Sequence, residues 1–300
     1  MAEPPRRSSA TEPPRSSEAE RPADDRVLPV TRWVALAIIP FLVVAAFLLF
    51  AFPERTGELF AWAIAPPLSA YLLASAYVGG IWFFVRVAVA RRWHHVRRGF
   101  PAVVVFAGAL LIATLLHLDK FSQNLSFVVW MALYATTPFV VAVVAFVQRP
   151  RDPGTPDTPD AVIPRAWRFG LAAIGAAALV IGAVMFAAPQ LAIGVWAWSL
   201  TPLTAQVTGA VLSLTGVVNA ALLWDSRWSA FRPVFQAQLL SLLAIAVSLI
   251  ARREDLLWDR PATPAFLVLV GGALVLYTVF TLRCEALTRR ATAPSVLEAR

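Results

Sequence analysis

The stretch WVALAIIPFLVVAAFLLFAF (residues 33–52) runs for 20 positions without a charged side chain. A helix needs about 20 apolar residues to cross roughly 30 Å of membrane hydrocarbon. Inside a bilayer, only helices and closed barrels satisfy every backbone N–H and C=O group. The stretch is continuously apolar, whereas barrel strands alternate between apolar and polar residues. It therefore predicts a membrane-spanning helix.

The rest of the chain repeats this pattern. Hydrophobic residues make up 59% of the 300 positions and charged residues only 15%, whereas a typical soluble domain has about 25% charged residues. Seven further apolar stretches are long enough to span a membrane: 66–90, 100–118, 125–148, 167–188, 202–224, 233–251 and 262–282. We therefore predict an all-α integral membrane protein with eight transmembrane helices.

The positive charge is distributed unevenly along the chain. Its formal net charge is +8, with 25 Arg and one Lys. If the N-terminus is cytoplasmic, the cytoplasmic loops and C-terminal tail hold 14 Arg, and the opposite loops hold five Lys or Arg. This asymmetry follows the positive-inside rule and predicts that both termini are cytoplasmic. Because topology accounts for the charge, we expect membrane lipids and not nucleic acid as partners. The Arg-rich, Lys-poor usage favours a bacterial cytoplasmic (inner) membrane.

Polar segments divide the chain into five parts. Residues 1–31 are rich in Pro, Ser, Arg and Glu, which predicts a disordered cytoplasmic tail. Residues 149–165 form a Pro-rich segment that predicts an extended cytoplasmic linker. Residues 284–300 form a second cytoplasmic tail. The two membrane regions, 32–148 and 166–283, contain four predicted spans each.

The two membrane regions resemble each other in sequence. FAWAIAPPLSA (60–70) and VWAWSLTPLTA (195–205) share an order of Trp, Pro, Leu and small residues, at an offset of 135 to 136 positions. Arg227-Trp228 corresponds to Arg92-Trp93 at the same offset. Because a four-span unit returns the chain to its starting side, we predict two tandem parallel repeats, related by an axis along the membrane normal. The Trp residues before each Pro are expected in an interfacial aromatic belt.

Polar residues within the spans are the candidate ligand-binding residues, because such groups are costly in a membrane and often functional. Within each span, these polar residues recur at helical spacing, so that they lie on a shared face of the helix. The set comprises Tyr71, Ser75 and Arg86 in the first half, and Gln206, Ser213, Gln238, Ser241, Ser248 and Arg252 in the second. The alternative interpretation is helix packing, with Arg86 extending to the membrane interface.

Two carboxylates at the outer ends of spans correspond under the repeat, Asp119 and Glu254. Each lies beside a cation, which favours structural ion pairs, and a catalytic carboxylate is the alternative. The chain has no H-E-x-x-H, G-x-S-x-G or phosphate-loop motif and a single cysteine. His94 and His95 would point about 100° apart on a helix, which is unsuitable for one metal ion. We therefore assign no catalytic residue, no metal and no cofactor.

Three functions are compatible with these patterns. The leading hypothesis is that the protein binds or moves a lipid or apolar small molecule within the helix bundle, and is not an enzyme. The first alternative is an enzyme that acts on lipid-linked substrates at the outer membrane face through Asp119, Glu254 and Arg252. The second is a structural or accessory subunit of a membrane complex, with a membrane-protein partner or as a homo-oligomer. The sequence specifies neither a substrate nor an oligomeric state.

Overall fold

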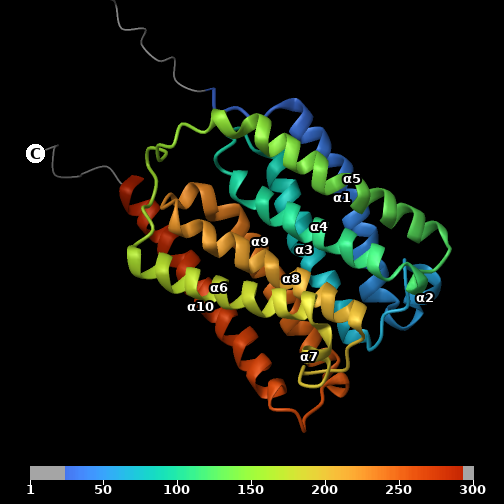
Figure 1. Cartoon of the computed structure of the whole chain (residues 1–300). Helices are drawn as coiled ribbons and strands as arrows, with labels where there is room; N and C mark the ends of the chain where they lie inside the picture. The colour runs from blue at the N-terminus through green and yellow to red at the C-terminus, as the bar shows by residue number, and fades with distance from the viewer. Residues whose placement is uncertain (1–23, 293–300) are drawn as a thin grey trace, which may run out of the picture.

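The computed structural model describes residues 24–292, and these residues form helices and connecting segments without a regular β-strand (Figure 1). The predicted tail residues 1–23 and 293–300 lie outside the described residues. The helices are α1 (Pro29–Ala51), α2 (Thr56–Leu59), α3 (Pro67–Val89), α4 (Phe100–Leu116), α5 (Leu125–Gln148), α6 (Arg165–Ala187), α7 (Pro189–Ile193), α8 (Pro202–Ala220), α9 (Trp228–Ala251) and α10 (Ala262–Thr292).

Eight of these helices are long and apolar enough to cross a membrane, as the sequence predicts. The short helices α2 and α7 precede α3 and α8. The helix α10 continues nine residues past the predicted boundary at 283, because residues 284–292 contain neither Pro nor Gly to end it. The described part of the predicted C-terminal tail is therefore helical.

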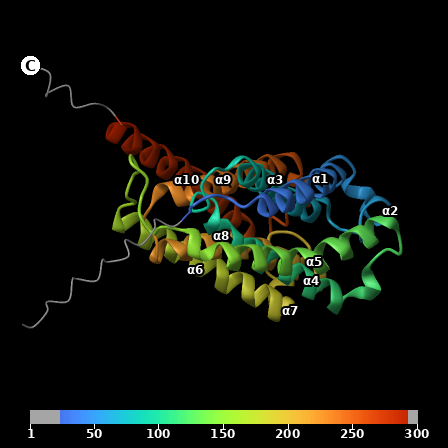
Figure 2. The same cartoon turned by 90° about the horizontal axis from the view of Figure 1, so that it is seen from above.

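The two halves of the chain pack against each other through helices of both halves. Helix α1 packs on α3 and α6 packs on α8 within their halves, but α9 packs on α3 and α4 packs on α8 across the halves. The views in Figures 1 and 2 place α3 and α8 in the interior, with α5 and α10 toward the outside. The second helix of each half thus provides the surface on which the third helix of the other half packs.

Glycines allow the closest of these helix contacts. A Cβ atom added at Gly209 of α8 would lie 2.5 Å from the carbonyl oxygen of Gly182 in α6. A Cβ atom added at Gly79 of α3 would lie 2.2 Å from the Oγ of Ser241 in α9. Small residues permit such approach of backbones in membrane helices, where dispersion contacts replace the hydrophobic effect between helices.

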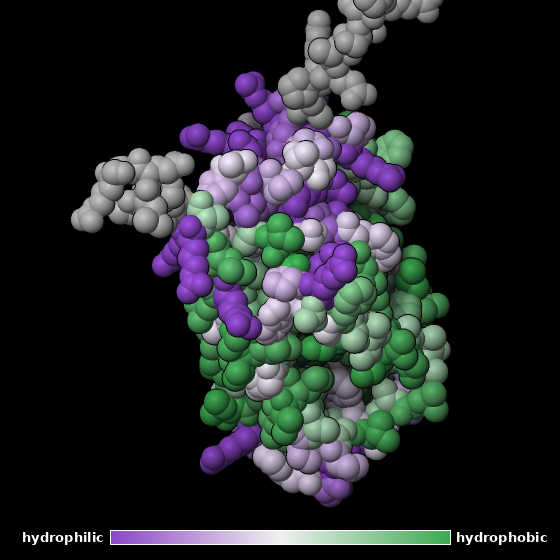
Figure 3. Space-filling model, turned by 90° about the vertical axis from the view of Figure 1, so that its left-hand side faces the viewer, coloured by the Kyte–Doolittle hydropathy of each residue, from purple (hydrophilic) through white to green (hydrophobic). Residues whose placement is uncertain are grey.

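The connections form two polar ends. The basic end consists of residues 24–28, 90–99, 149–164 and 221–227, and the opposite end of residues 52–66, 117–124, 188–201 and 252–261. Figure 3 shows a hydrophobic band between a large hydrophilic region, beside the grey terminal residues, and a smaller one at the other end. This distribution is that of a protein that spans a bilayer.

Segments that the sequence assigns to a free tail and a linker pack onto the basic end. Val27 and Ile163 are buried, and their backbone N–H groups donate to the carbonyls of Arg91 and Ser226 at 3.3 and 2.7 Å. Thr31, at the end of the predicted tail, is buried within α1. The described residues 24–31 therefore pack on the protein, and residues 149–165 contact it through buried Ala161 and Ile163 and through the side chain of Asp152.

The paired Trp residues do not form an interfacial belt. Trp62 and Trp198 are only 2% and 0% exposed. The ring of Trp62 packs on Trp130 of α5 at a centroid distance of 4.9 Å, and that of Trp198 packs on Phe266 of α10 at 5.3 Å. The prediction of a belt is wrong for these two positions because their loops fold inward over the helix ends.

Candidate functional site

A cavity of about 640 Å³ lies within the helix bundle. Residues from all eight membrane-length helices line it, and most of them are aliphatic or aromatic. Ligand cavities in proteins typically measure about 300–1,000 Å³ and combine apolar walls with a few polar groups. The size and lining of this cavity fit that description.

The cavity opens on the side of the second half. Its lining residues from α1 and α3, such as Ile38 and Leu72, are buried. In contrast, the lining residues Ile181 of α6 and Leu269 of α10 are 46% and 53% exposed. The mouth therefore lies between α6 and α10, at the level of the hydrophobic band.

Three of the predicted residues line this cavity: Ser75, Gln238 and Ser241. The hydroxyl of Ser75 donates to the carbonyl of Tyr71, four residues earlier, at 2.7 Å. Gln238 is 9% exposed, and both the oxygen and the nitrogen of its side-chain amide are buried without a hydrogen-bond partner in the protein. Gln238 is therefore a polar group of the wall that remains available for a ligand.

Three tyrosines in the cavity wall were not among the predicted residues. The hydroxyls of Tyr77 and Tyr134 lie 2.9 Å apart and join α3 to α5. Asn219 of α8 donates to the hydroxyl of Tyr277 in α10 at 2.6 Å. Their positions in the sequence could have identified them as candidates, because all four tyrosines of the chain lie within predicted spans and not at their ends.

Three predicted residues make hydrogen bonds within the protein. Gln206 donates from Nε2 to the carbonyl of Phe186 at 3.0 Å, and its Oε1 lies 3.1 Å from Nε2 of His117. The hydroxyls of Ser213 and Ser248 donate to carbonyls three and four residues earlier in their own helices, at 2.6 and 2.8 Å. None of the three lines the cavity.

Tyr71 and Arg86 also lie outside the cavity lining. The ring of Tyr71 packs on Phe50 at a centroid distance of 5.4 Å. Arg86 is half-buried in the last turn of α3, close to the basic end, and its Nε has no hydrogen-bond partner. Of the three residues predicted in the first half, only Ser75 therefore lines the cavity.

The predicted outer-face charges form ion pairs at the opposite end. Asp119 lies 2.9 Å from Lys120, and both side chains are exposed. Arg252 lies 3.3 Å from Glu254 and 3.6 Å from Asp255. Neither Asp119 nor Glu254 lines the cavity.

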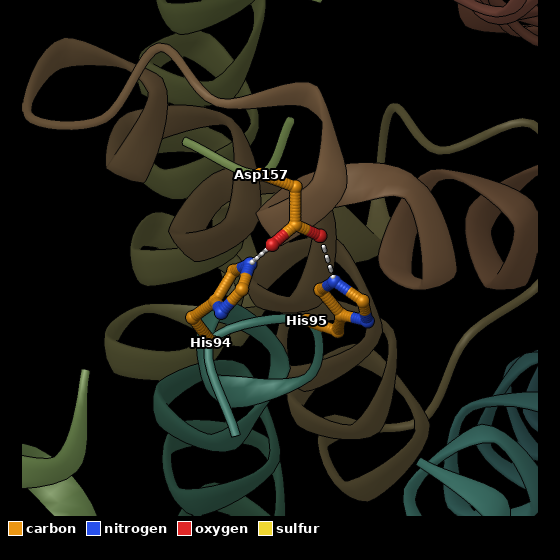
Figure 4. Close-up of side chains that lie close together, drawn as sticks. All are labelled: His94, His95 and Asp157. Atoms are coloured by element: carbon orange, nitrogen blue, oxygen red, sulfur yellow. Dashed lines mark hydrogen bonds and ion pairs between the residues drawn. The ribbon is translucent and has the colours of Figure 1, made fainter. Parts of the chain in front are cut away.

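A second group of chemically capable side chains lies at the basic end, where His94 and His95 approach Asp157 of the linker (Figure 4). Nε2 of His95 lies 2.6 Å from one carboxylate oxygen of Asp157, and Nε2 of His94 lies 3.4 Å from the other. The two histidines occupy a turn and not a helix, and the His94 side chain is only 1% exposed. Because the two histidines lie in a turn, the 100° divergence of neighbouring helical residues does not apply to them.

The helices and the cavity together define an all-helical membrane protein with an apolar cavity in its membrane-spanning part. Comparison of the chain with protein-family models, curated proteins and solved structures found no match.

Proposed function

We propose that this protein binds a lipid or another elongated apolar molecule in the cavity, which the ligand enters sideways from the membrane between α6 and α10. The observation that carries the proposal is the combination of a largely apolar cavity with exposed lining residues on these two helices. A ligand that enters from the bilayer exchanges one apolar environment for another. Selectivity must therefore come from the shape of the cavity and its few polar groups.

Gln238 supplies the polar contact. It is the eleventh residue of the 24-residue helix α9, close to the middle of the membrane. An amide that is buried without a partner costs about 1–3 kcal/mol. A carbonyl or hydroxyl group of the ligand would pair with Gln238 at this depth, so we propose a ligand with a polar group between apolar segments or at the end of one.

We further propose that the two halves are tandem parallel repeats. Corresponding loops make corresponding contacts: the N–H of Ser122 donates to the carbonyl of Ala61 at 2.8 Å, and the N–H of Leu257 donates to the carbonyl of Ala197 at 2.9 Å. These donors are 135 positions apart and the acceptors 136, the offset of the sequence match.

Hydrogen bonds at the basic end also support the proposal that the two halves are repeats. The N–H of His94 donates to the side chain of Asp25 at 3.0 Å, and the N–H of Ser229 donates to that of Asp160 at 3.0 Å. Both residue pairs are offset by 135 positions. Under this proposal the ligand site lies between the two repeats, because helices of both halves line the cavity, and its mouth lies beside α6 and α10 of the second half.

The basic end faces the cytoplasm in this proposal, and the membrane is the bacterial inner membrane. The support is the concentration of Arg in the basic end, which the positive-inside rule places in the cytoplasm. Two alternatives, an outer-face enzyme and an accessory subunit, lack a comparable observation. The exposed pairs formed by Asp119 and Glu254 do not face the cavity.

Cross-linking tests the proposal. The full chain would be reconstituted in vesicles that contain a phospholipid with a photoreactive group at the end of one acyl chain, and cross-linked peptides would be mapped by mass spectrometry. We expect labels on buried lining residues of α8 and α9, such as Val218 and Ile245. Labels confined to outward-facing residues, such as Val180 and Val268, would overturn the proposal.

A further inference from the structure

We propose that His94, His95 and Asp157 bind a divalent transition-metal ion, with Zn²⁺ as the best match, at the basic end of the molecule. The site is separate from the membrane cavity, and the inference does not depend on the proposed ligand. One nitrogen from each imidazole and one carboxylate oxygen lie within 4.8 Å of one another. Figure 4 shows both rings directed toward the carboxylate.

Asp25 holds the ring of His94 in the state that a metal requires. Its carboxylate accepts a hydrogen bond from the backbone N–H of His94 at 3.0 Å, and its second oxygen lies 2.5 Å from Nδ1 of the same residue. Because the carboxylate is an acceptor, Nδ1 carries a proton. A neutral His94 ring then presents a lone pair on Nε2, toward Asp157. Metal-bound histidines are commonly oriented by a carboxylate in this way.

A cation between His94 and Asp157 would interact favourably with the atoms through which the two side chains face each other. Nε2 of His94 is buried and makes no hydrogen bond, although a carboxylate oxygen of Asp157 lies 3.4 Å away. In the neutral tautomer, a nitrogen lone pair faces oxygen lone pairs at a partly buried site. A metal ion would convert this repulsion into two coordinate bonds.

The spacing requires only small adjustments. Zn²⁺ binds nitrogen at about 2.0–2.1 Å and carboxylate oxygen at about 2.0–2.2 Å, so that ligand atoms of a tetrahedral site lie about 3.3 Å apart. The two contacts between histidine and carboxylate, 2.6 and 3.4 Å, bracket this spacing. Rotation of the His95 ring, whose side chain is 35% exposed, would bring its nitrogen into place.

The ligand types identify the class of metal. Two imidazoles and one carboxylate suit Zn²⁺ and its first-row neighbours, whereas Ca²⁺ and Mg²⁺ prefer sites made of oxygen. Arg92 pairs with Asp157 in the structure, and metal binding would displace it. Because the Arg92 side chain is 57% exposed, it can turn into solvent. Three protein ligands leave the fourth position for water.

The bound ion would cross-link two segments that are distant in the sequence. His94 and His95 belong to the turn that precedes α4, whereas Asp157 belongs to the linker between the halves. Asp25, which orients His94, comes from the segment that precedes α1. A metal at this point would connect the linker directly to the first half and would stabilise the folded state by its binding free energy.

The test uses the full chain, purified in detergent, stripped with a chelator and dialysed against micromolar Zn²⁺. We expect one Zn²⁺ per chain for the native protein and at least a tenfold weaker affinity for His95→Ala and Asp157→Asn. His117→Ala, which removes the histidine outside the cluster, should bind like the native protein. X-ray absorption should show two imidazole nitrogens on the ion at about 2.0 Å.

Two results would overturn the inference. The first is native protein without bound Zn²⁺ at neutral pH. The second is equal Zn²⁺ binding by the native protein and by Asp157→Asn, which would place the ion elsewhere. His95 and Asp157 are only partly buried, so these variants should fold. A thermal melt of each variant without metal verifies this before the binding measurement.

Discussion

Arg227 donates hydrogen bonds to both carboxylate oxygens of Asp152, at 2.8 and 2.9 Å, and thereby fastens the linker to the residue that precedes α9. The same guanidinium also donates to Asp225 at 2.7 Å, and Arg98 donates to Asp225 at 2.6 Å. The network thus joins the linker, the second half and the start of α4. All four side chains are at least four-fifths buried.

We predict that Asp152→Asn lowers stability by about 3 kcal/mol, because it leaves the buried guanidinium of Arg227 with one carboxylate instead of two. The matched control is Asp24→Asn, whose exposed side chain pairs with Arg26 and Arg151, and it should change stability by less than about 1 kcal/mol. Thermal unfolding in detergent measures both. Equal effects of the two substitutions would show that the network does not hold the linker.

The network also predicts a loss of stability in acid. Burial raises the pKa of Asp225, but hydrogen bonds from Arg227 and Arg98 outweigh this effect and lower the pKa to about 2. A carboxyl with a depressed pKa stabilises the folded state above its unfolded pKa of about 4, and this contribution is lost as the pH falls toward 2. We therefore expect the melting temperature of the native protein to fall across this interval.

The variant Asp225→Asn isolates this contribution. Its melting temperature should lie below that of the native protein at pH 6, and the difference should shrink as the pH falls from about 4 to 2. A difference that stays constant over this range would mean that Asp225 does not titrate as the structure implies.

A third prediction concerns the contact between α6 and α8. Gly209→Ala should destabilise the protein by about 1–3 kcal/mol, because the added Cβ would lie 2.5 Å from a backbone oxygen that has no alternative position. Gly271→Ala in α10 is the control, since nothing lies within 4 Å of an added Cβ there. It should be neutral or slightly stabilising through helix propensity. A Gly209 variant as stable as the control would contradict the close contact.

Gln238 and Gln206, which are both buried, should respond to substitution in opposite ways. Gln238→Leu removes an amide that has no partner, so the ligand-free protein should become more stable by about 1 kcal/mol. Gln206→Leu removes an amide that bonds Phe186 and His117, so stability should fall by a similar amount. Melting temperatures after exhaustive delipidation make the comparison, and a loss of stability in both variants would indicate that Gln238 pairs within the protein.

The positions of the spans could be predicted from the sequence because the thickness of a bilayer fixes the length of an apolar helix. Gln238 could be recognised in the same way, as a polar residue in an apolar run. The Trp prediction was wrong because Trp62 and Trp198 contact aromatic rings more than 60 positions away in sequence. Nothing local to a tryptophan distinguishes burial under a folded loop from a place among lipid headgroups.

The cavity and the His–Asp cluster could not be predicted for a related reason. Both depend on which helices and loops become neighbours, and the crossing of α9 onto α3 leaves no periodic signal in the sequence. Asp157 lies 62 positions from His95 in a Pro-rich stretch that resembles a free linker. Tyr77 and Tyr134 likewise become a pair only after α3 and α5 have packed.

If the cavity holds one lipid-like ligand, native mass spectrometry of protein released gently from its own membrane should detect it. Ala178 of α6 lines the cavity, whereas Ala173 of the same helix is exposed and does not. We predict one bound lipid-sized mass per chain for the native protein and for Ala173→Trp, and its loss in Ala178→Trp, where the indole fills the cavity. Equal retention of the mass by both Trp variants, or its absence from the native protein, would contradict the account.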